Sequence, residues 1–270
     1  MKEMKEQFDA VKMEVPFADY LKILNLRGLQ GDPELGGNCV HQIQILAEKL
    51  KAAGYKVSFI PDSESNHWAL LASDGKREFY MDPYLLHHDP VDISDLKEVG
   101  TKTVEALPVV DEKPTKIIFT RTRDGFNISS HMHRSRFLQY EMVWESKYDL
   151  NRRSKEIYAG EDGNPYFHPR RLFNIRVPFE NGEVMKLTWM IANGAREIQV
   201  GVMGPDPKSS RSYHEQDKFD LEMEKLVRRI GTTVPRLIST LSAANDLYQA
   251  ADPEMIRERM RKESLGMLEK

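Results

Sequence analysis

The sequence predicts an α+β fold with an N-terminal helical segment, a central antiparallel β-barrel-like region and a C-terminal α/β lobe. Three observations predict it: apolar residues recur at helical spacing before residue 55, short candidate strands separated by turns fill the middle of the chain, and helical spacing returns after residue 218. We therefore divide the 270 residues into a helical segment at 1–55, a β-barrel-like domain at 56–150 and a C-terminal β and helical lobe at 151–270.

The helical segment is expected to hold two helices. The first ends near residue 29, and its apolar positions are Phe17, Tyr20, Leu21, Leu24 and Leu26. A turn-rich stretch at 31–37 separates it from a second helix that begins at Cys39 and closes near Gly54, where a C-terminal glycine cap belongs. This pattern places the single cysteine of the chain at the opening of a helix.

The β region begins directly after the second helix. Short runs rich in apolar, aromatic and β-branched residues predict strands at Lys56–Ile60, His67–Ala72, Glu78–Met81, Lys116–Arg121, Phe137–Glu145, Leu172–Phe179, Glu183–Met190 and Ile198–Val202. Turn sequences at 73–75, 123–125 and 180–182 indicate hairpin connections. Successive hairpins predict an antiparallel sheet or barrel.

The C-terminal helices follow a polar, serine-rich segment at 205–218 that is predicted to be a loop. Apolar stripes at 219–230 and 237–241 predict two helices, the second with Pro235 near its start. Asp252-Pro253 opens a third, highly charged helix whose opposite charges recur at near-helical spacing. We expect this last helix to be exposed or packed against a partner.

Composition and charge narrow the class of protein. The chain has 39 Lys and Arg against 42 Asp and Glu, a formal net charge of −3, so bulk charge does not favour nucleic-acid binding. No window approaches the roughly 18 uninterrupted apolar residues of a membrane-spanning helix, and the N-terminus lacks the apolar core of a signal peptide. We expect a cytoplasmic protein with neither a nucleic-acid nor a membrane partner.

Cys39 has no second cysteine to pair with, so it is either a small buried apolar residue or a reactive thiol. A helix N-terminus stabilises a thiolate through its partial positive charge and its unpaired N–H groups. Gly36 and Gly37 allow the backbone to approach closely, so a substrate carbonyl can reach the sulfur while local N–H groups form an oxyanion site. These features favour the reactive thiol.

His67 and Asp82 supply the remaining groups for nucleophilic catalysis. His67 begins one candidate strand and Asp82 ends the next, with an Asp74-Gly75 hairpin turn between them. In a hairpin the start of the first strand lies beside the end of the second, so imidazole and carboxylate come within reach of each other. Taken singly, either residue is more often a surface or turn residue. In combination they predict a triad in which Cys39 attacks, His67 holds its proton and Asp82 orients the imidazole.

These motifs resemble those of the arylamine N-acetyltransferases. Gly36-Gly37-Asn38-Cys39 is similar to the family's Gly-Gly-x-Cys motif, and His67 and Asp82 look like its second and third triad positions at similar spacing. Further along, Lys116–Tyr148 resembles the family's middle barrel and Asn164–Met190 its third lobe.

The resemblance implies an acyltransferase of the amide-synthase type. A thioester donor, either acyl-CoA or a phosphopantetheine-linked acyl group, passes its acyl group to Cys39, and a small-molecule amine then takes it to form an amide. The resemblance implies no cofactor and no metal, and it makes an acyl carrier protein a candidate partner. Substrate contacts are expected from Gly37, Asn38, Trp68 and Tyr84.

Departures from the family pattern concern the acceptor. Leu35 and His41 stand where the family usually has an Arg–Glu pair, and Pro-Tyr-Leu-Leu at 83–86 replaces glycines that would flank the acceptor pocket. We therefore expect an acceptor other than a generic arylamine. His67-Trp68 and Asp82-Pro83 also resemble the transglutaminase-like enzymes, which share the Cys-His-Asp triad.

Two alternative functions stay open. A transglutaminase-like or other cysteine hydrolase forms the same acyl-cysteine but passes it to water or to a protein lysine. A non-catalytic binding protein keeps the fold without the chemistry.

Other clusters of ligand-type residues favour less specific interpretations. His87-His88 and His131-x-His133 lack a complete ligand set for a metal, so we interpret them as surface loops. A set of arginines is positioned to contact the phosphates of an acyl-CoA, although clustered arginines usually form a solvated face. These are Arg134, Arg136, Arg170 and Arg171.

Overall fold

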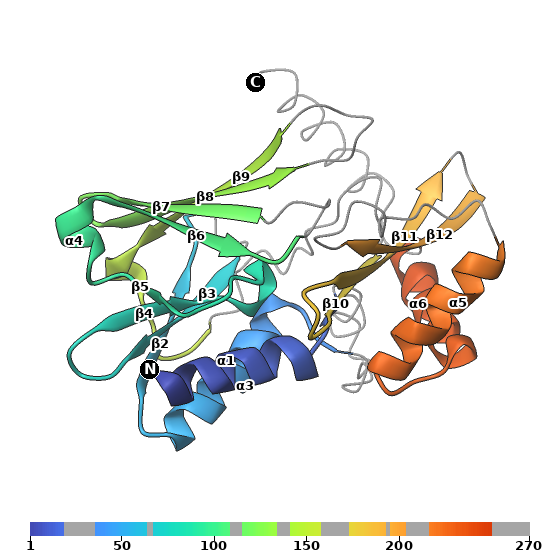
Figure 1. Ribbon diagram of the computed structural model, residues 1–270, viewed down its shortest axis with the longest axis horizontal. Coiled ribbons are helices and arrows are strands. Elements are labelled where there is room, and N and C mark those ends of the chain that lie inside the picture. Colours follow the sequence, from blue (N-terminus) through green and yellow to red (C-terminus); the bar gives the residue numbers. More distant parts are fainter. Residues whose placement is uncertain are drawn as a thin grey trace.

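The computed structural model describes residues 1–18, 36–63, 67–108, 115–133, 141–157, 173–192, 195–203 and 216–249. These residues form five α-helices and three four-stranded antiparallel sheets (Figure 1). The predicted α+β class is confirmed. The first two sheets and the two N-terminal helices gather on one side of the molecule, and the third sheet with the two C-terminal helices lies on the other.

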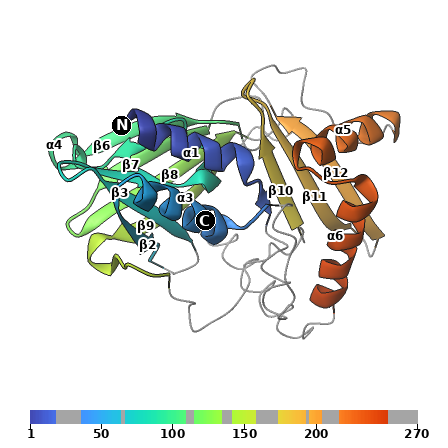
Figure 2. The ribbon, with the colours of Figure 1, turned by 90° about the horizontal axis from the view of Figure 1, so that it is seen from below.

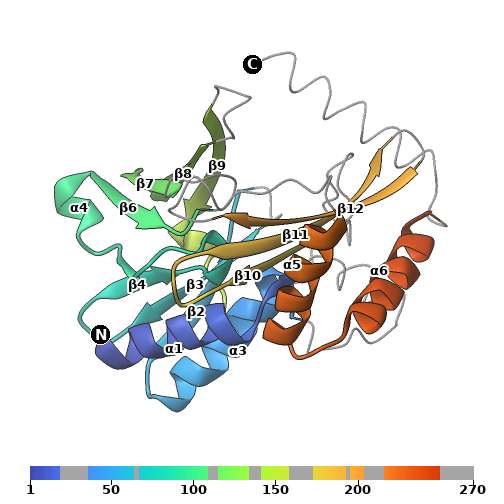
Figure 3. The same ribbon diagram turned by 45° about the vertical axis from the view of Figure 1, so that its right-hand side comes forward.

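The first sheet has the strand order β2-β3-β4-β5. Its strands are β2 (Lys56–Pro61), β3 (Trp68–Ser73), β4 (Glu78–Met81) and β5 (Val91–Asp92). Helices α1 (Lys2–Glu14) and α3 (Cys39–Ala52) cover one face of this sheet (Figure 3). The apolar side chains between helices and sheet include Met4, Phe8, Val11, Ile43, Leu46, Leu50, Phe59, Trp68, Leu70, Phe79 and Met81.

The second sheet has the order β6-β7-β8-β9 and packs against the other face of the first. Its strands are β6 (Thr101–Ala106), β7 (Thr115–Arg121), β8 (Gly125–His133) and β9 (Glu141–Asp149), and α4 (Leu96–Val99) precedes them. The core between the sheets includes Ile60, Leu71, Tyr80, Val91, Ile117, Phe119, Phe126, Ile128 and Tyr148. Because β3 is buried on both faces, its side chains of both orientations are apolar.

The β-barrel-like region is thus a pair of facing sheets. Within the described residues no continuous ladder joins them into a closed barrel. Two isolated bridges, between Asp62 and Tyr148 and between His87 and Ala106, connect the sheets instead. The bridge between Asp62 and Tyr148 lies close to the hydrogen bonds of the candidate active site.

The third sheet has the order β1-β10-β11-β12. Its strands are β1 (Phe17–Ala18), β10 (Phe173–Pro178), β11 (Val184–Ala192) and β12 (Ala195–Met203). Helices α5 (Gln216–Arg229) and α6 (Val234–Gln249) cover one face of it, as Figure 2 shows. The strand β1 comes directly after α1 in the chain, so it brings the third sheet next to the N-terminal helices.

Two hydrogen bonds fix the end of α1 at this junction. The Gln42 side-chain amide donates to the Val15 carbonyl at 2.7 Å, and the Arg229 guanidinium donates to the Met13 carbonyl at 2.6 Å. One bond comes from the helix that carries Cys39 and the other from α5. The junction therefore sets where the two sides of the molecule meet.

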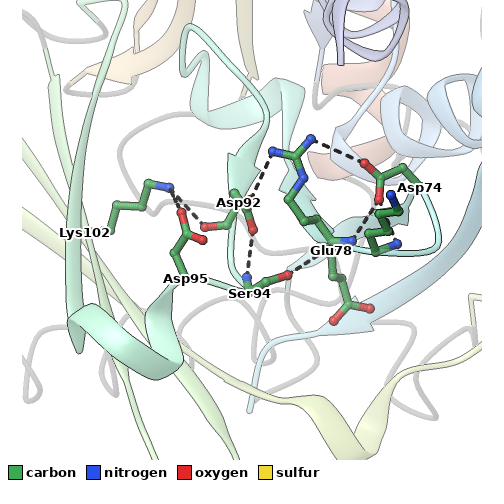
Figure 4. Close-up of polar contacts among 8 residues, drawn as sticks. Asp74, Glu78, Asp92, Ser94, Asp95 and Lys102 are labelled. Atoms are coloured by element: carbon green, nitrogen blue, oxygen red, sulfur yellow. Dashed lines mark hydrogen bonds and ion pairs between the residues drawn. The ribbon is translucent and has the colours of Figure 1, made fainter.

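A polar network secures the far end of the first sheet (Figure 4). The Glu78 N–H donates to the Ser94 hydroxyl at 2.8 Å, and the Ser94 N–H donates to the Asp92 carboxylate at 2.9 Å. Lys102, at the start of the second sheet, lies 3.4 Å from the Asp95 carboxylate and donates to the Asp92 carbonyl. These contacts hold β4 and β5 in register and so fix the hairpin that ends at Asp82.

Most predicted elements are present near their predicted bounds. The helix at Cys39 and the three hairpins with turns at 73–75, 123–125 and 180–182 are confirmed. The helix predicted through Phe17 is wrong, because Phe17 pairs with β10 as a strand, and the helix lies earlier, at α1. The remainder of that prediction, at 19–35, lies outside the described residues, as does the charged helix after residue 252.

Two strands of the second sheet, β6 and β8, were not predicted. Both carry many polar side chains, and β6 alternates exposed and half-buried residues along its length. Their pairing with β7 supplies the stability that the sequence pattern alone does not indicate. Among the described helices, none combines the length and apolar character needed to cross a bilayer.

Candidate active site

Cys39 occupies the first position of α3, and Asn38 caps that helix. The Asn38 side-chain oxygen accepts the His41 N–H at 2.9 Å, and its carbonyl accepts the Gln42 N–H at 3.0 Å. The N–H groups of Cys39 and Val40 have no acceptor within the helix, because α3 begins there. A half-exposed sulfur thus lies among amide donors that can stabilise negative charge.

Gly36 and Gly37, just before Cys39, allow close packing against Pro16 and His41. Gly36 has a φ of +101°, and a Cβ atom there would collide with the Pro16 carbonyl. A Cβ atom at Gly37 would collide with the His41 ring. The Gly37 N–H donates to the Pro16 carbonyl at 2.9 Å, so this segment is anchored to the start of β1. The approach of a substrate carbonyl to the sulfur stays a prediction.

His67 and Asp82 lie at adjacent ends of the β3–β4 hairpin, and their side chains are hydrogen-bonded to each other. The His67 Nε2 atom is 2.6 Å from Asp82 Oδ2, and both side chains are buried. With Nε2 engaged by the carboxylate, Nδ1 is the ring nitrogen left to exchange a proton with a nucleophile. The hairpin argument from the sequence is therefore confirmed in its geometry.

The pKa of His67 lies well above its ordinary 6.5. Desolvation on burial is the largest single effect and lowers this pKa. The charges of Asp82, Tyr148 and Cys39, together with the hydrogen bond to Asp82, outweigh it and raise the pKa. The helix that begins at Cys39 contacts β3 and the turn at Pro83–Leu85, the two segments that follow His67 and Asp82. An imidazolium that persists at neutral pH is the partner that a thiolate requires.

Asp82 is fully buried, and both of its oxygens are used. Oδ2 also accepts the Tyr80 hydroxyl at 3.1 Å, and Oδ1 accepts the Tyr84 N–H at 3.0 Å. Burial raises the pKa of Tyr80 well above 10 and that of Tyr148 to about 12, so both phenols stay protonated and can donate. A carboxylate with these donors is held in one orientation.

His87 holds the backbone of Asp82, a role that the sequence did not reveal. The Asp82 N–H donates to His87 Nε2 at 3.1 Å, while His87 Nδ1 lies 2.7 Å from the Asp89 carbonyl and donates to it. Burial lowers the pKa of His87 to about 4, so the ring is neutral in this tautomer. The surface-loop interpretation of His87 is wrong, because the residue has no exposed area.

Lys12 fixes the loop of His87 from the side of α1. Its ammonium group, itself buried, donates to the His87 carbonyl at 2.8 Å and pairs with the Asp9 carboxylate at 2.8 Å. Burial lowers the pKa of Lys12, an effect that Asp9 partly offsets. The first helix therefore stabilises the carboxylate end of the site, although it lies far from that end in the sequence.

Two aromatic rings pack against the His67 ring. Tyr84 and Trp144 have ring centroids 5.2 Å and 5.5 Å from that of His67. Phe17 packs against Tyr84 with the centroids 4.8 Å apart. Phe17 and Trp144 were not among the predicted site residues, because each comes from a strand that only the tertiary fold brings to the hairpin.

The predicted substrate-contacting residues have different surroundings. Gly37, Asn38 and Tyr84 lie near Cys39 and His67. Trp68 is buried in the core beneath α1 and α3. Their roles toward a substrate stay predictions. The four arginines predicted to reach phosphates lie outside the described residues. Within the described residues, no group of three metal-ligating side chains occurs.

The class that this architecture defines is an α+β fold in which a cysteine at a helix N-terminus lies near a hairpin that carries a histidine and an aspartate. A solved structure of arylamine N-acetyltransferase from Salmonella typhimurium has a similar fold, with a TM-score of 0.54. The comparison covers 87% of this chain and 89% of that chain at 10% sequence identity. No protein-family model matches the sequence, and no curated protein matches it.

At this identity the similarity concerns the fold alone. It extends over most of both chains, so the expected likeness to the acetyltransferase fold is confirmed at the level of the overall fold. Membership of the family stays a prediction.

Proposed function

We propose that this protein is an acyltransferase that moves an acyl group from a thioester donor through an acyl-Cys39 intermediate to an amine, forming an amide. The single observation that supports it is the buried 2.6 Å contact between His67 and Asp82, near a cysteine at the first turn of α3. The fold similarity to an arylamine N-acetyltransferase points in the same direction. The donor's carrier is CoA or an acyl carrier protein, and the chemistry needs no cofactor.

In the first half-reaction the Cys39 thiolate attacks the thioester carbonyl. Amide N–H groups at the start of α3 stabilise the negative charge that develops on the carbonyl oxygen. The bond from the acyl carbon to the donor sulfur breaks, and the departing thiolate takes the proton from the His67 imidazolium. The products are acyl-Cys39, a neutral His67 and a free thiol.

In the second half-reaction an amine attacks acyl-Cys39. His67, now neutral, accepts a proton from the amine through Nδ1, while Asp82 at Nε2 stabilises the imidazolium that forms. The bond from the acyl carbon to Cys39 breaks and regenerates the thiolate. The aromatic side chains of Tyr84 and Trp144 beside His67 favour a substrate with an apolar body.

Intact-mass spectrometry of wild type and Cys39→Ala, after exposure to acetyl-CoA and to longer acyl-CoA thioesters, tests the proposal. We expect wild type alone to gain the mass of the acyl group, and a subsequently added amine to remove it as an amide. Cys39→Ala should show the same thermal unfolding as wild type, so that a missing adduct reports chemistry and not misfolding.

The alternatives give different results in the same experiment. An acyl adduct that decays equally fast with and without amine indicates a hydrolase. Absence of any adduct on wild type, with every thioester, contradicts the proposal and favours a binding protein.

A further inference from the structure

Arg176, on β10, is a buried cation with unused hydrogen-bonding capacity. Its side chain is 4% exposed. Its Nε and Nη2 atoms are buried and have no hydrogen-bond partner among the described residues. A buried charge without a partner destabilises the folded state, and each buried N–H without an acceptor adds to that cost. Such a group in a folded protein calls for an explanation.

The guanidinium lies one aromatic ring away from the catalytic histidine. Its central carbon is 4.0 Å from the centroid of the Tyr84 ring and 4.5 Å from that of Phe17. Tyr84 packs against His67. Phe17 is paired with Arg176 in the third sheet and bridged to Gly37, two residues before Cys39. Arg176 is therefore linked to His67 through Tyr84 and to the segment before Cys39 through Phe17.

The two unused nitrogens belong to one edge of the guanidinium. The N–H bonds of Nε and Nη2 run parallel along that edge, and their spacing matches the two oxygens of a carboxylate. The aromatic rings of Phe17 and Tyr84 provide only π-electron contacts and leave the edge without an acceptor. A ligand oxyanion would supply what the described residues do not.

We propose that Arg176 binds a carboxylate of the substrate and so selects acidic acyl groups or acidic amines. This inference rests on the proposed acyl transfer and names a substrate class for it. The carboxylate has two possible sources, the acyl group of the donor and the acceptor amine, and both would present the same chemistry to Arg176.

Two matched substrate pairs separate the sources. The donor pair is succinyl-CoA and pentanoyl-CoA, which have acyl groups of similar length and differ in the terminal carboxylate. The acceptor pair is 3-aminobenzoate and 3-aminobenzamide, tested with acetyl-CoA as donor. We expect wild type to prefer the acidic member of one pair by about 10²-fold in kcat/KM, because a bidentate charged contact is lost with the neutral member.

Arg176→Met should abolish that preference while leaving kcat/KM for the neutral members within about threefold. Arg176→Lys keeps the positive charge but not the two parallel N–H donors, so an intermediate preference is expected. Arg153→Met, which removes an exposed arginine paired with Glu78, is the charge-matched control and should keep the wild-type preference.

Failure of this inference is distinguishable from failure of the proposed function. Acylation by acetyl-CoA and amide formation, with no preference for the acidic member of either pair, would overturn the role of Arg176 alone. An equal loss of activity with all four substrates in Arg176→Met would also overturn it. The wild-type preference decides the question even if Arg176→Met does not fold. Absence of acyl-Cys39 with every donor instead removes the proposed function on which the inference rests.

Discussion

The carboxylate side and the guanidinium side of the site are both buried, but they differ in how their charges are satisfied. Asp82 accepts hydrogen bonds from a histidine, a phenol and a backbone amide. Arg176 has two buried nitrogens without a partner among the described residues. The folded protein therefore supplies the hydrogen-bond donors that Asp82 needs, whereas the described part of the chain supplies no acceptor for these two nitrogens of Arg176.

The two sides also differ in origin. The partners of Asp82, namely His67, Tyr80 and Tyr84, come from its own hairpin and the turn after it. The neighbours of Arg176 come from β1 and from the end of the first sheet, which are distant in sequence. Local structure therefore positions His67, the proposed base, and the packing of the third sheet positions Arg176.

The largest expected effect is on turnover, at the carboxylate side. Asp82→Asn keeps the shape of the side chain but removes its charge and allows the imidazole to adopt the wrong tautomer, so kcat should fall by about 10³- to 10⁴-fold. Steady-state kinetics with the best thioester and amine check this. Asp92→Asn, another buried aspartate of the same sheet, is the matched control and should keep near-wild-type kcat. Equal losses in both variants would contradict a specific role for Asp82.

The next effect concerns the segment that joins the two sides. Gly36→Ala places a Cβ atom against the Pro16 carbonyl and forces a left-handed backbone on alanine, so it should destabilise the protein by about 3–4 kcal/mol. Gly54 has a similar φ of +85° but open space around it, so Gly54→Ala should cost only about 1 kcal/mol. Urea unfolding measures both. Similar losses would mean that backbone strain, and not the contact with β1, dominates at Gly36.

A pH effect of about 3 kcal/mol is expected from His87. Its folded pKa is about 4 and its ordinary value is 6.5, so between these values the unfolded chain binds a proton that the folded chain does not. The free energy of unfolding should therefore fall as the pH drops from 6.5 to 4, by about 3 kcal/mol from this group.

His87→Gln keeps an acceptor for the Asp82 N–H but cannot titrate, so its unfolding free energy should depend less on pH across this window. Urea unfolding of wild type and variant at four pH values between about 4 and 7 tests the difference. Parallel pH profiles would mean that the neutral, buried state of His87 does not affect stability.

The smallest effect is on stability at the guanidinium side. Arg176→Met replaces a buried charge that has no hydrogen-bond partner for Nε and Nη2 among the described residues, and its side chain is apolar and of similar length. The free energy of unfolding should therefore be unchanged or higher by up to about 2 kcal/mol. Chemical unfolding without substrate measures it. A loss of several kcal/mol would indicate that Arg176 already has a structural partner, and it would remove the contrast with Asp82.

The sequence predicted the parts of the site that depend on local structure. Asn38 and the two glycines identify a helix start at Cys39, and Asp74-Gly75 identifies a hairpin that brings His67 to Asp82. The residues missed, among them His87 and Trp144, carry no such local signal. The burial of His87 depends on Lys12 and α1. The contact of Trp144 with His67 depends on the packing of the second sheet against the first.

The sequence by itself determined the helix start at Cys39 and the hairpin that brings His67 to Asp82, because helix caps and hairpin turns are encoded within a few neighbouring residues. Only the tertiary structure decided that the central region is two facing sheets, that Phe17 is a strand residue, and that Arg176 lies beside Tyr84. Pairing between distant strands depends on which buried surfaces fit together, and that information is spread over the whole chain.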